Sequence, residues 1–184
     1  MYKNWEELEQ ECKNCEKCKL CKNRKNVVIG EGNKNAKIMF IGEGPGADED
    51  EQGLPFVGKA GQLMNNALKG VGINREEVYI ANIVKCRPPG NRDPEQDEIK
   101  ECIQYLKNQI ELIKPEKIIL LGRIALKAIL GEQYNITQTR GTVIEKDSIK
   151  YYPTYHPAAL LRDETKKIDF INDLKMVIEK LTSV

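Results

Sequence analysis

A short apolar run that breaks directly into a glycine-rich turn constrains this chain more than any other feature. The run covers residues 38–41, and the turn, with three glycines and a proline, follows at residues 42–46. An apolar run of this length bounded by glycine is typical of a buried strand. In open α/β sheets ligands bind beyond the carboxyl ends of such strands, and glycine lets the backbone approach a ligand closely. We therefore expect Gly42 and Gly44 to border a substrate site.

Strand-length and helix-length patterns alternate along the rest of the chain. Apolar runs of strand length also occupy residues 78–84, 117–121 and 150–155. Helical patterns are found at residues 4–12, 61–71, 94–113, 123–130 and 169–181. Residues 138–145 are expected to form a loop and an edge strand, and Asp93 before Pro94 is typical of a helix N-cap. The alternation predicts an α/β fold in which a parallel sheet has helices on both faces.

The composition is that of a globular protein. The 184 residues are 40% hydrophobic and 31% charged, which suits one domain with a core of its own. No apolar run approaches the roughly 18 residues that cross a membrane, and the N-terminal segment has no apolar signal region. We therefore expect a cytoplasmic protein that does not bind membranes.

The net charge of +1 conceals a basic segment. Residues 13–25 carry six Lys or Arg side chains against one acid, Glu16. Local positive charge of this kind permits a nucleic-acid surface. A solvated basic face explains the same residues, so this segment alone does not decide between the two.

Six cysteines form a dense group and a distant pair: Cys12, Cys15, Cys18, Cys21, Cys86 and Cys102. Disulfides are rare in proteins that are not secreted, and a Cys-x-x-Cys pair with two distant cysteines indicates a four-thiolate metal site. Tetrahedral thiolate sets suit both zinc and iron–sulfur clusters. Because the dense group offers more than one Cys-x-x-Cys pair, the ligand choice stays open, and ordinary reduced cysteines are the alternative.

Polar and aromatic side chains follow the ends of the predicted strands: Glu43, Glu49, Phe56, Asn82 and His156. The carboxyl ends of parallel strands meet at one edge of a sheet, so these residues are expected to share a pocket. Structural explanations exist for four of them: a solvated acidic loop for Glu43 and Glu49, a satisfied core amide for Asn82 and a structural role for His156. The glycine spacing matches neither a P-loop nor a dinucleotide fingerprint, which argues against nucleoside triphosphate and NAD sites.

Three segments together resemble the family 4 uracil-DNA glycosylases, the iron–sulfur enzymes of thermophilic bacteria and archaea. They are residues 42–63, 83–94 and 155–161. The resemblance implies one domain over residues 1–184, built as a three-layer α/β/α sandwich around a four-stranded parallel sheet. It also implies that residues 12–21 contribute to a [4Fe-4S] cluster, with these ligands: Cys15, Cys18, Cys86 and Cys102. Cys12 and Cys21 are additional to that pattern.

The resemblance further implies a monomer that flips and hydrolytically excises uracil from single- or double-stranded DNA, leaving an abasic site. The catalytic residues would be Glu43, Glu49 and His156, and the substrate-binding residues Gly42, Gly44, Phe56 and Asn82. Residues expected to contact DNA are Arg87, Arg92, Leu160, Leu161 and Arg162. Two alternatives remain, a glycosylase of the same superfamily for another damaged base and a non-enzymatic nucleic-acid-binding module with a structural zinc.

Overall fold

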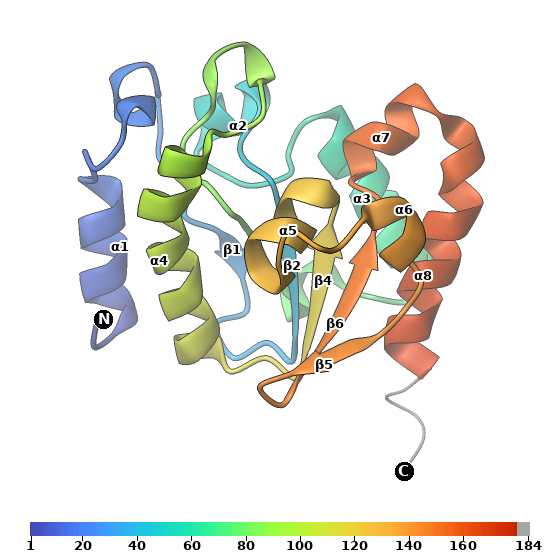
Figure 1. The fold of residues 1–184 in the computed structure, drawn as a ribbon. Helices are drawn as coiled ribbons and strands as arrows, with labels where there is room; N and C mark the ends of the chain where they lie inside the picture. Colours follow the sequence, from blue (N-terminus) through green and yellow to red (C-terminus); the bar gives the residue numbers. More distant parts are fainter. Residues whose placement is uncertain (180–184) are drawn as a thin grey trace.

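A six-stranded sheet forms the centre of the molecule in the computed structural model, which describes residues 1–179 (Figure 1). Its four inner strands are parallel: β3 (Tyr79–Asn82), β2 (Ile38–Gly42), β4 (Lys117–Leu121) and β6 (Ile149–Thr154). Two short antiparallel strands complete its edges: β1 (Glu31–Gly32) and β5 (Ile144–Lys146). The predicted four-stranded parallel sheet is therefore confirmed as the inner sheet, and β5 falls at the expected edge strand.

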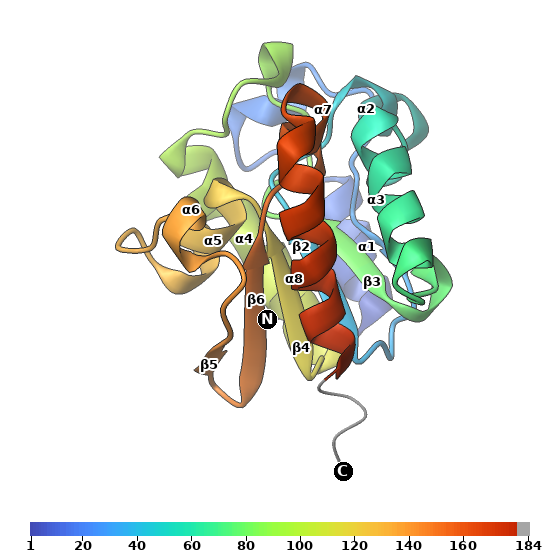
Figure 2. The same ribbon diagram turned by 90° about the vertical axis from the view of Figure 1, so that its right-hand side faces the viewer.

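Helices cover both faces of the sheet, which confirms the predicted α/β/α sandwich (Figures 1 and 2). One face carries α1 (Trp5–Lys13), α4 (Gln96–Ile113) and α5 (Arg123–Leu130). The opposite face carries α3 (Lys59–Gly70), α7 (Pro157–Arg162) and α8 (Lys167–Glu179). Two short helices lie in the connections: α2 (Ala47–Gln52) and α6 (Ile136–Thr139). Among residues 1–179, no helix combines the length and apolar character needed to span a bilayer.

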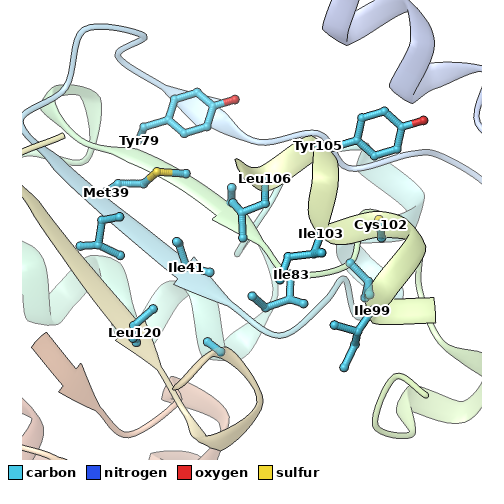
Figure 3. Close-up of a cluster of buried hydrophobic side chains, with 14 of the residues drawn as sticks. Met39, Ile41, Tyr79, Ile83, Ile99, Cys102, Ile103, Tyr105, Leu106 and Leu120 are labelled. Carbon is cyan, nitrogen blue, oxygen red and sulfur yellow. The ribbon is translucent and has the colours of Figure 1, made fainter. Parts of the chain in front are cut away.

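Alternation along each inner strand divides the core into two layers. Met39 and Ile41 of β2 pack with the residues of α4, whereas Ile38 and Phe40 pack with those of α3 and α8. Figure 3 shows Ile103 and Leu106 of α4 lying toward the strand residues of the first layer. Successive strand side chains point to opposite faces, so a sheet buried on both faces requires continuous apolar runs. This is why these strands could be recognised from the sequence.

Three segments near the carboxyl ends of the strands differ from expectation, and two short elements, β1 and α6, were not predicted. The acidic run after Gly46, expected as a loop, forms α2, and Gly53 ends it in the left-handed region at φ 73°. The segment after His156, where no helical pattern was expected, forms α7. Helix α4 begins at Gln96, and its N-cap is Glu95 instead of Asp93. The predicted C-terminal helix is α8, whose expected last residues, 180–181, lie outside the described residues.

Candidate active site

A cleft of about 780 Å³ opens at the carboxyl ends of the parallel strands. The following residues singled out from the sequence line it: Glu43, Gly44, Glu49, Phe56, Asn82, Arg92, His156 and Arg162. Gly42, Arg87, Leu160 and Leu161 are not among its lining residues. Its volume is within the usual range for small-molecule sites, and its position is the one expected for an open α/β sheet. The polar strand-end residues therefore gather at one place.

Close packing at the base of the cleft requires glycine at position 42. A Cβ atom there would lie 2.5 Å from Asn82 Oδ1 and 2.6 Å from Phe56 Cζ. Any side chain at Gly42 would therefore displace both residues. Gly42 serves the site through the space that it leaves, although it does not line the cleft itself.

The backbone of Phe56 is held in an unusual conformation by Arg75, a residue that sequence reasoning missed. Phe56 has φ 51°, which is rare for a bulky side chain. Arg75 Nη1 donates to the Phe56 carbonyl at 2.9 Å, and Arg75 Nη2 donates to the Pro55 carbonyl at 2.5 Å. A Cβ atom on Gly61 would lie 2.0 Å from the Phe56 carbonyl oxygen. The aromatic wall of the cleft thus depends on the Arg75 guanidinium, which lies outside the recognised motifs, and on Gly61, which lies within residues 42–63.

Asn82 presents an unpaired hydrogen-bond acceptor at the end of β3. Its side chain is 2% exposed, and its Oδ1 atom has no hydrogen-bond partner among the described residues. Buried polar groups are nearly always paired, so an exception calls for an explanation. Because Asn82 also lines the cleft, a ligand N–H group is the partner that the site lacks.

His156 is a neutral hydrogen-bond donor. Its Nδ1 atom accepts from the Ala158 N–H at 3.0 Å and so caps α7, which leaves the imidazole proton on Nε2. Burial, with a smaller effect of the Arg162 charge, lowers the pKa of His156 to about 4. The side chain therefore stays uncharged near neutral pH and can offer Nε2–H to a ligand in the cleft.

The two glutamates have different surroundings. Burial, followed by the charge of Asp93, raises the pKa of Glu43 to about 7. The Glu49 carboxylate accepts from three backbone N–H groups, those of Gly46 at 3.1 Å, Val57 at 2.9 Å and Gly58 at 2.7 Å. Glu49 therefore ties the start of α2 to the segment after Phe56, while Glu43 has a perturbed pKa of the kind found at functional sites.

All six cysteines line a second, small cavity on the α4 side of the molecule. Burial raises the pKa of Cys86 to about 11 and that of Cys102 to about 12. Arg24 Nη1 donates to Cys86 Sγ at 3.6 Å, and the Lys85 N–H donates to Cys102 Sγ at 3.2 Å. Hydrogen bonds to sulfur and an all-cysteine donor set fit an iron–sulfur cluster. Within residues 1–179, no three His, Cys, Asp or Glu side chains converge closely enough to hold one metal ion.

Comparisons with known proteins agree with this arrangement. The family model described as the uracil DNA glycosylase superfamily matches residues 29–179. The chain belongs to this superfamily. A type-4 uracil-DNA glycosylase of Thermotoga maritima is 48% identical to it over 148 residues, which are 79% of this chain and 77% of the relative.

Two glycosylases of Pyrobaculum aerophilum, one of type 4 and one of type 5, show which family within the superfamily this chain resembles more closely. The type-4 enzyme is 44% identical over 179 residues, covering 93% of this chain and 91% of the relative. The type-5 enzyme is 30% identical over 146 residues, covering 70% and 64%. The sequence thus resembles the type-4 glycosylase more closely and over a greater length, in agreement with the resemblance inferred from its motifs.

The arginines expected to contact DNA differ in how many hydrogen bonds their guanidinium groups already make within the protein. Both terminal nitrogens of Arg92 donate to the buried carboxylate of Glu98, at 2.9 Å and 2.6 Å. Arg87 donates to Asn91 Oδ1 at 2.8 Å through Nε. Arg162 is exposed at the end of α7 and lines the cleft. Arg92 therefore fastens its loop to α4. Among the described residues, the terminal nitrogens of Arg87 and the guanidinium of Arg162 have no hydrogen-bond partner, so they are available to contact DNA.

The two adjacent leucines of α7 point in different directions. Leu160 is 0% exposed and belongs to the core layer beneath α3 and α8, whereas Leu161 is 48% exposed. The exposed Leu161 is therefore the better candidate for DNA contact.

The basic segment at residues 13–25 already forms ion pairs within the protein, because Lys19 pairs with Glu95 and Lys25 pairs with Glu51. Exposed basic groups near the cleft are therefore better candidates for DNA contact than this segment.

Proposed function

We propose that this protein is a monofunctional uracil-DNA glycosylase of type 4 that hydrolyses the bond between uracil and deoxyribose and leaves an abasic site. The observation that carries the proposal is the unpaired Oδ1 of buried Asn82 in a cleft that also holds a neutral His156 and the ring of Phe56. The names of the type-4 relatives support the same reaction.

Asn82 provides the base recognition in this proposal. Its Oδ1 accepts from uracil N3–H and its Nδ2 donates to uracil O4, whereas cytosine has an acceptor and a donor at the matching positions. A buried amide opposite cytosine would therefore be mispaired, which is a strong basis for discrimination. Extracting the base from the stack costs a few kcal/mol, and stacking on Phe56 offsets roughly 1–3 kcal/mol of that cost.

His156 acts on the departing uracil in this proposal, and Glu43 acts on the sugar and the attacking water. As the N1–C1′ bond breaks, its electron pair goes to uracil, and His156 Nε2–H donates to uracil O2, where negative charge develops. The Glu43 carboxylate stabilises the developing sugar cation, orients a water molecule toward C1′ and accepts a proton from it. Uracil then leaves as an anion that takes a proton from solvent. Glu49, with three backbone N–H groups already on its carboxylate, shapes the site.

The cysteine cavity holds a [4Fe-4S] cluster in this proposal. The thiolates of Cys15, Cys18, Cys86 and Cys102 are the ligands, and all four line the cavity. When bound, the cluster supplies a structural cross-link and no step of the glycosidic chemistry. Its ligands lie in the N-terminal segment, after β3 and on α4, so the cross-link would fix the loop that carries Arg87.

Contact with DNA is assigned to exposed groups around the cleft. Arg87 and Arg162 have guanidinium nitrogens available for phosphate oxygens. Leu161 is exposed and adjacent to Arg162, so it is the residue that fills the space left by a flipped base. The residues assigned to the cleft form a complete set within one chain, so the proposed reaction requires no second subunit and the protein is proposed to act as a monomer. The absence of disulfides among the six cysteines of the described residues suits a reducing compartment such as the cytoplasm.

Base release from matched oligonucleotides tests the proposal. Substrates with a single deoxyuridine or a single deoxycytidine are incubated with the protein, and abasic sites are cleaved with alkali. We expect cleavage at deoxyuridine alone. Release at another damaged base, or no release by folded, brown protein, would contradict the uracil assignment, and a colourless protein with stoichiometric zinc would favour a zinc-containing module.

A matched pair of variants ties the activity to the cleft. Asn82→Asp removes the donor to uracil O4, and we expect uracil release to fall by at least about 100-fold. Asn108→Asp makes the same change on α4, outside the cleft, at another buried amide whose Oδ1 lacks a partner in the described chain. Because the new carboxylate faces Glu111, to which the Asn108 amide now donates, we expect a lower melting temperature. The rate of the folded protein should stay within about twofold of the parent value. Equal losses in the two variants would contradict the role of Asn82.

A further inference from the structure

A second carboxyl group lies beside Glu43 in the cleft. Asp93 comes from the segment before α4, and its carboxyl group is within hydrogen-bonding reach of the Glu43 carboxyl. Both line the cleft with Arg123, the first residue of α5. Arg123 Nη2 donates to Asp93 Oδ2 at 2.6 Å. Segments that are distant in the sequence thus bring two acids and one guanidinium together.

Asp93 is not needed as a helix cap. Asp93 precedes a proline, as helix N-caps often do, yet the N-cap of α4 is Glu95. The Asp93–Arg123 ion pair is itself a weak source of stability, because both side chains are 53% exposed. What distinguishes the pair is its contact with the acid that the proposed reaction uses.

We propose that Asp93, anchored by Arg123, is a positioning residue for Glu43 and determines the pH at which Glu43 becomes able to orient the attacking water. This inference rests on the proposed function. Two carboxyl groups in contact do not both ionise freely, because their negative charges repel each other. Arg123 favours the ionised form of Asp93, so the remaining proton resides on Glu43.

The charges around Glu43 agree with this division. The hydrogen bond from Arg123 lowers the pKa of Asp93. Burial and then the Asp93 charge raise the pKa of Glu43 to about 7, while Arg123 and Arg162 act in the opposite direction. Other charged residues line the cleft from α2, α3 and the segments before α4 and α8: Asp48, Glu49, Lys59, Arg92 and Lys166. Asp93 is the acid in hydrogen-bond contact with Glu43.

The pH dependence of uracil release under single-turnover conditions tests the inference, with pH varied from about 5 to 9. For the parent protein we expect the rate to rise with pH, with a midpoint near 7, as Glu43 ionises. Asp93→Asn removes the repelling charge and keeps the shape, so its midpoint should fall by about one pH unit. Arg123→Gln removes a cation that favours ionised Glu43, so its midpoint should rise.

A surface control separates this effect from a general loss of charge. Glu116→Gln removes one negative charge from an exposed ion pair with Lys37, outside the cleft, and should leave the midpoint unchanged. A uniform loss of rate in Asp93→Asn at every pH, with the parent midpoint, would overturn the inference.

A titration without substrate keeps the inference separate from the reaction. In ¹³C NMR, the Glu43 carboxyl should titrate at lower pH in Asp93→Asn than in the parent protein, whether or not uracil is released. An unchanged titration would overturn the positioning role and leave the glycosylase proposal intact. An active parent protein with no acid limb near pH 7 would also overturn it. If the parent protein releases no uracil at any pH, the proposed glycosylase function is contradicted, and the positioning role of Asp93 is contradicted with it.

Discussion

The rings of Phe56 and His156 lie 5.5 Å apart at an interplanar angle of 31°. Phe56 reaches this position from the segment after α2, and His156 reaches it from the end of β6. The contact means that the aromatic wall of the cleft and its imidazole donor support each other. A base stacked on Phe56 would thus lie within reach of a donor whose position is already fixed.

Replacing His156 by asparagine should separate its chemical role from its structural one. Asparagine is a favourable N-cap residue, so His156→Asn preserves the cap of α7 that His156 Nδ1 now forms. It lacks the Nε2–H donor, and we expect the single-turnover rate of uracil release to fall by about 10²–10³-fold. The melting temperature should stay close to that of the parent protein. A folded variant with a near-normal rate would refute the donor role.

Glu43→Gln should stabilise the protein at high pH. Because the pKa of Glu43 is raised to about 7 in the folded state, the folded state retains a proton that the unfolded chain has lost above its ordinary pKa near 4.5. The parent protein therefore loses stability as pH rises from about 4.5 to 7. The variant avoids this loss, and its free energy of unfolding should exceed the parent value by about 1–3 kcal/mol at pH 8.

Urea unfolding at pH 5 and pH 8 measures this effect. The two proteins should differ little at pH 5, and the same variant should release uracil far more slowly at pH 8. A stability difference that does not change with pH would contradict the raised pKa of Glu43.

Glu49→Ala should have the opposite effect on stability. The substitution leaves the N–H groups of Gly46, Val57 and Gly58 without the acceptor that they now share. We expect a loss of at least about 2 kcal/mol in the free energy of unfolding, with reduced uracil release because the neighbouring Phe56 is no longer held. Circular dichroism during thermal unfolding checks the stability, and a variant as stable as the parent protein would argue for a direct catalytic role.

The two leucines of α7 should respond differently to alanine. Leu160→Ala removes a fully buried side chain from the core, and such changes cost about 2–5 kcal/mol. Leu161→Ala changes an exposed side chain, so stability should persist while uracil release from double-stranded DNA falls more than release from single-stranded DNA. If Leu161→Ala lowers both rates equally, it does not act as a wedge.

Iron content should distinguish cluster ligands from the other cysteines. Cys86→Ala removes a proposed ligand, so the purified protein should lose its brown colour and its iron. Cys12→Ala serves as the matched control, because Cys12 lines the same cavity and is fully buried but is not a proposed ligand. Full iron content in Cys86→Ala, or loss of iron in Cys12→Ala, would require a different ligand set.

The inner strands and most long helices could be predicted because their apolar periodicity reflects burial directly. Helix α5 was predicted with its observed bounds, since its apolar face and the glycines on either side leave little choice. The short helices α2 and α7 were missed, because a helix of one or two turns depends on caps more than on periodicity. The Glu49 carboxylate on the Gly46 N–H is one such cap, and His156 on the Ala158 N–H is another.

The polar residues of the cleft could be identified from their positions at the strand ends. The separate role of each residue could not be predicted in this way. Nothing in the sequence separates Glu43 from Glu49, because the difference lies in their tertiary surroundings. Three backbone N–H groups donate to Glu49, whereas Glu43 is buried beside Asp93. The same holds for Asp93, whose partner Arg123 is remote in the sequence and comes near through the packing of α5. Tertiary contacts of this kind cannot be predicted from the spacing of residues along the sequence.

Arg75 is not among the residues that line the cleft, yet its guanidinium binds four acceptors from separate segments: Glu31 Oε2, Pro55 O, Phe56 O and Asn65 Oδ1. Lysine has no planar fork with which to reproduce these bonds. A random-mutagenesis screen for lost uracil release would therefore be expected to recover this position as often as the residues that touch the base. A side chain outside the cleft would then be as difficult to replace as those that line it.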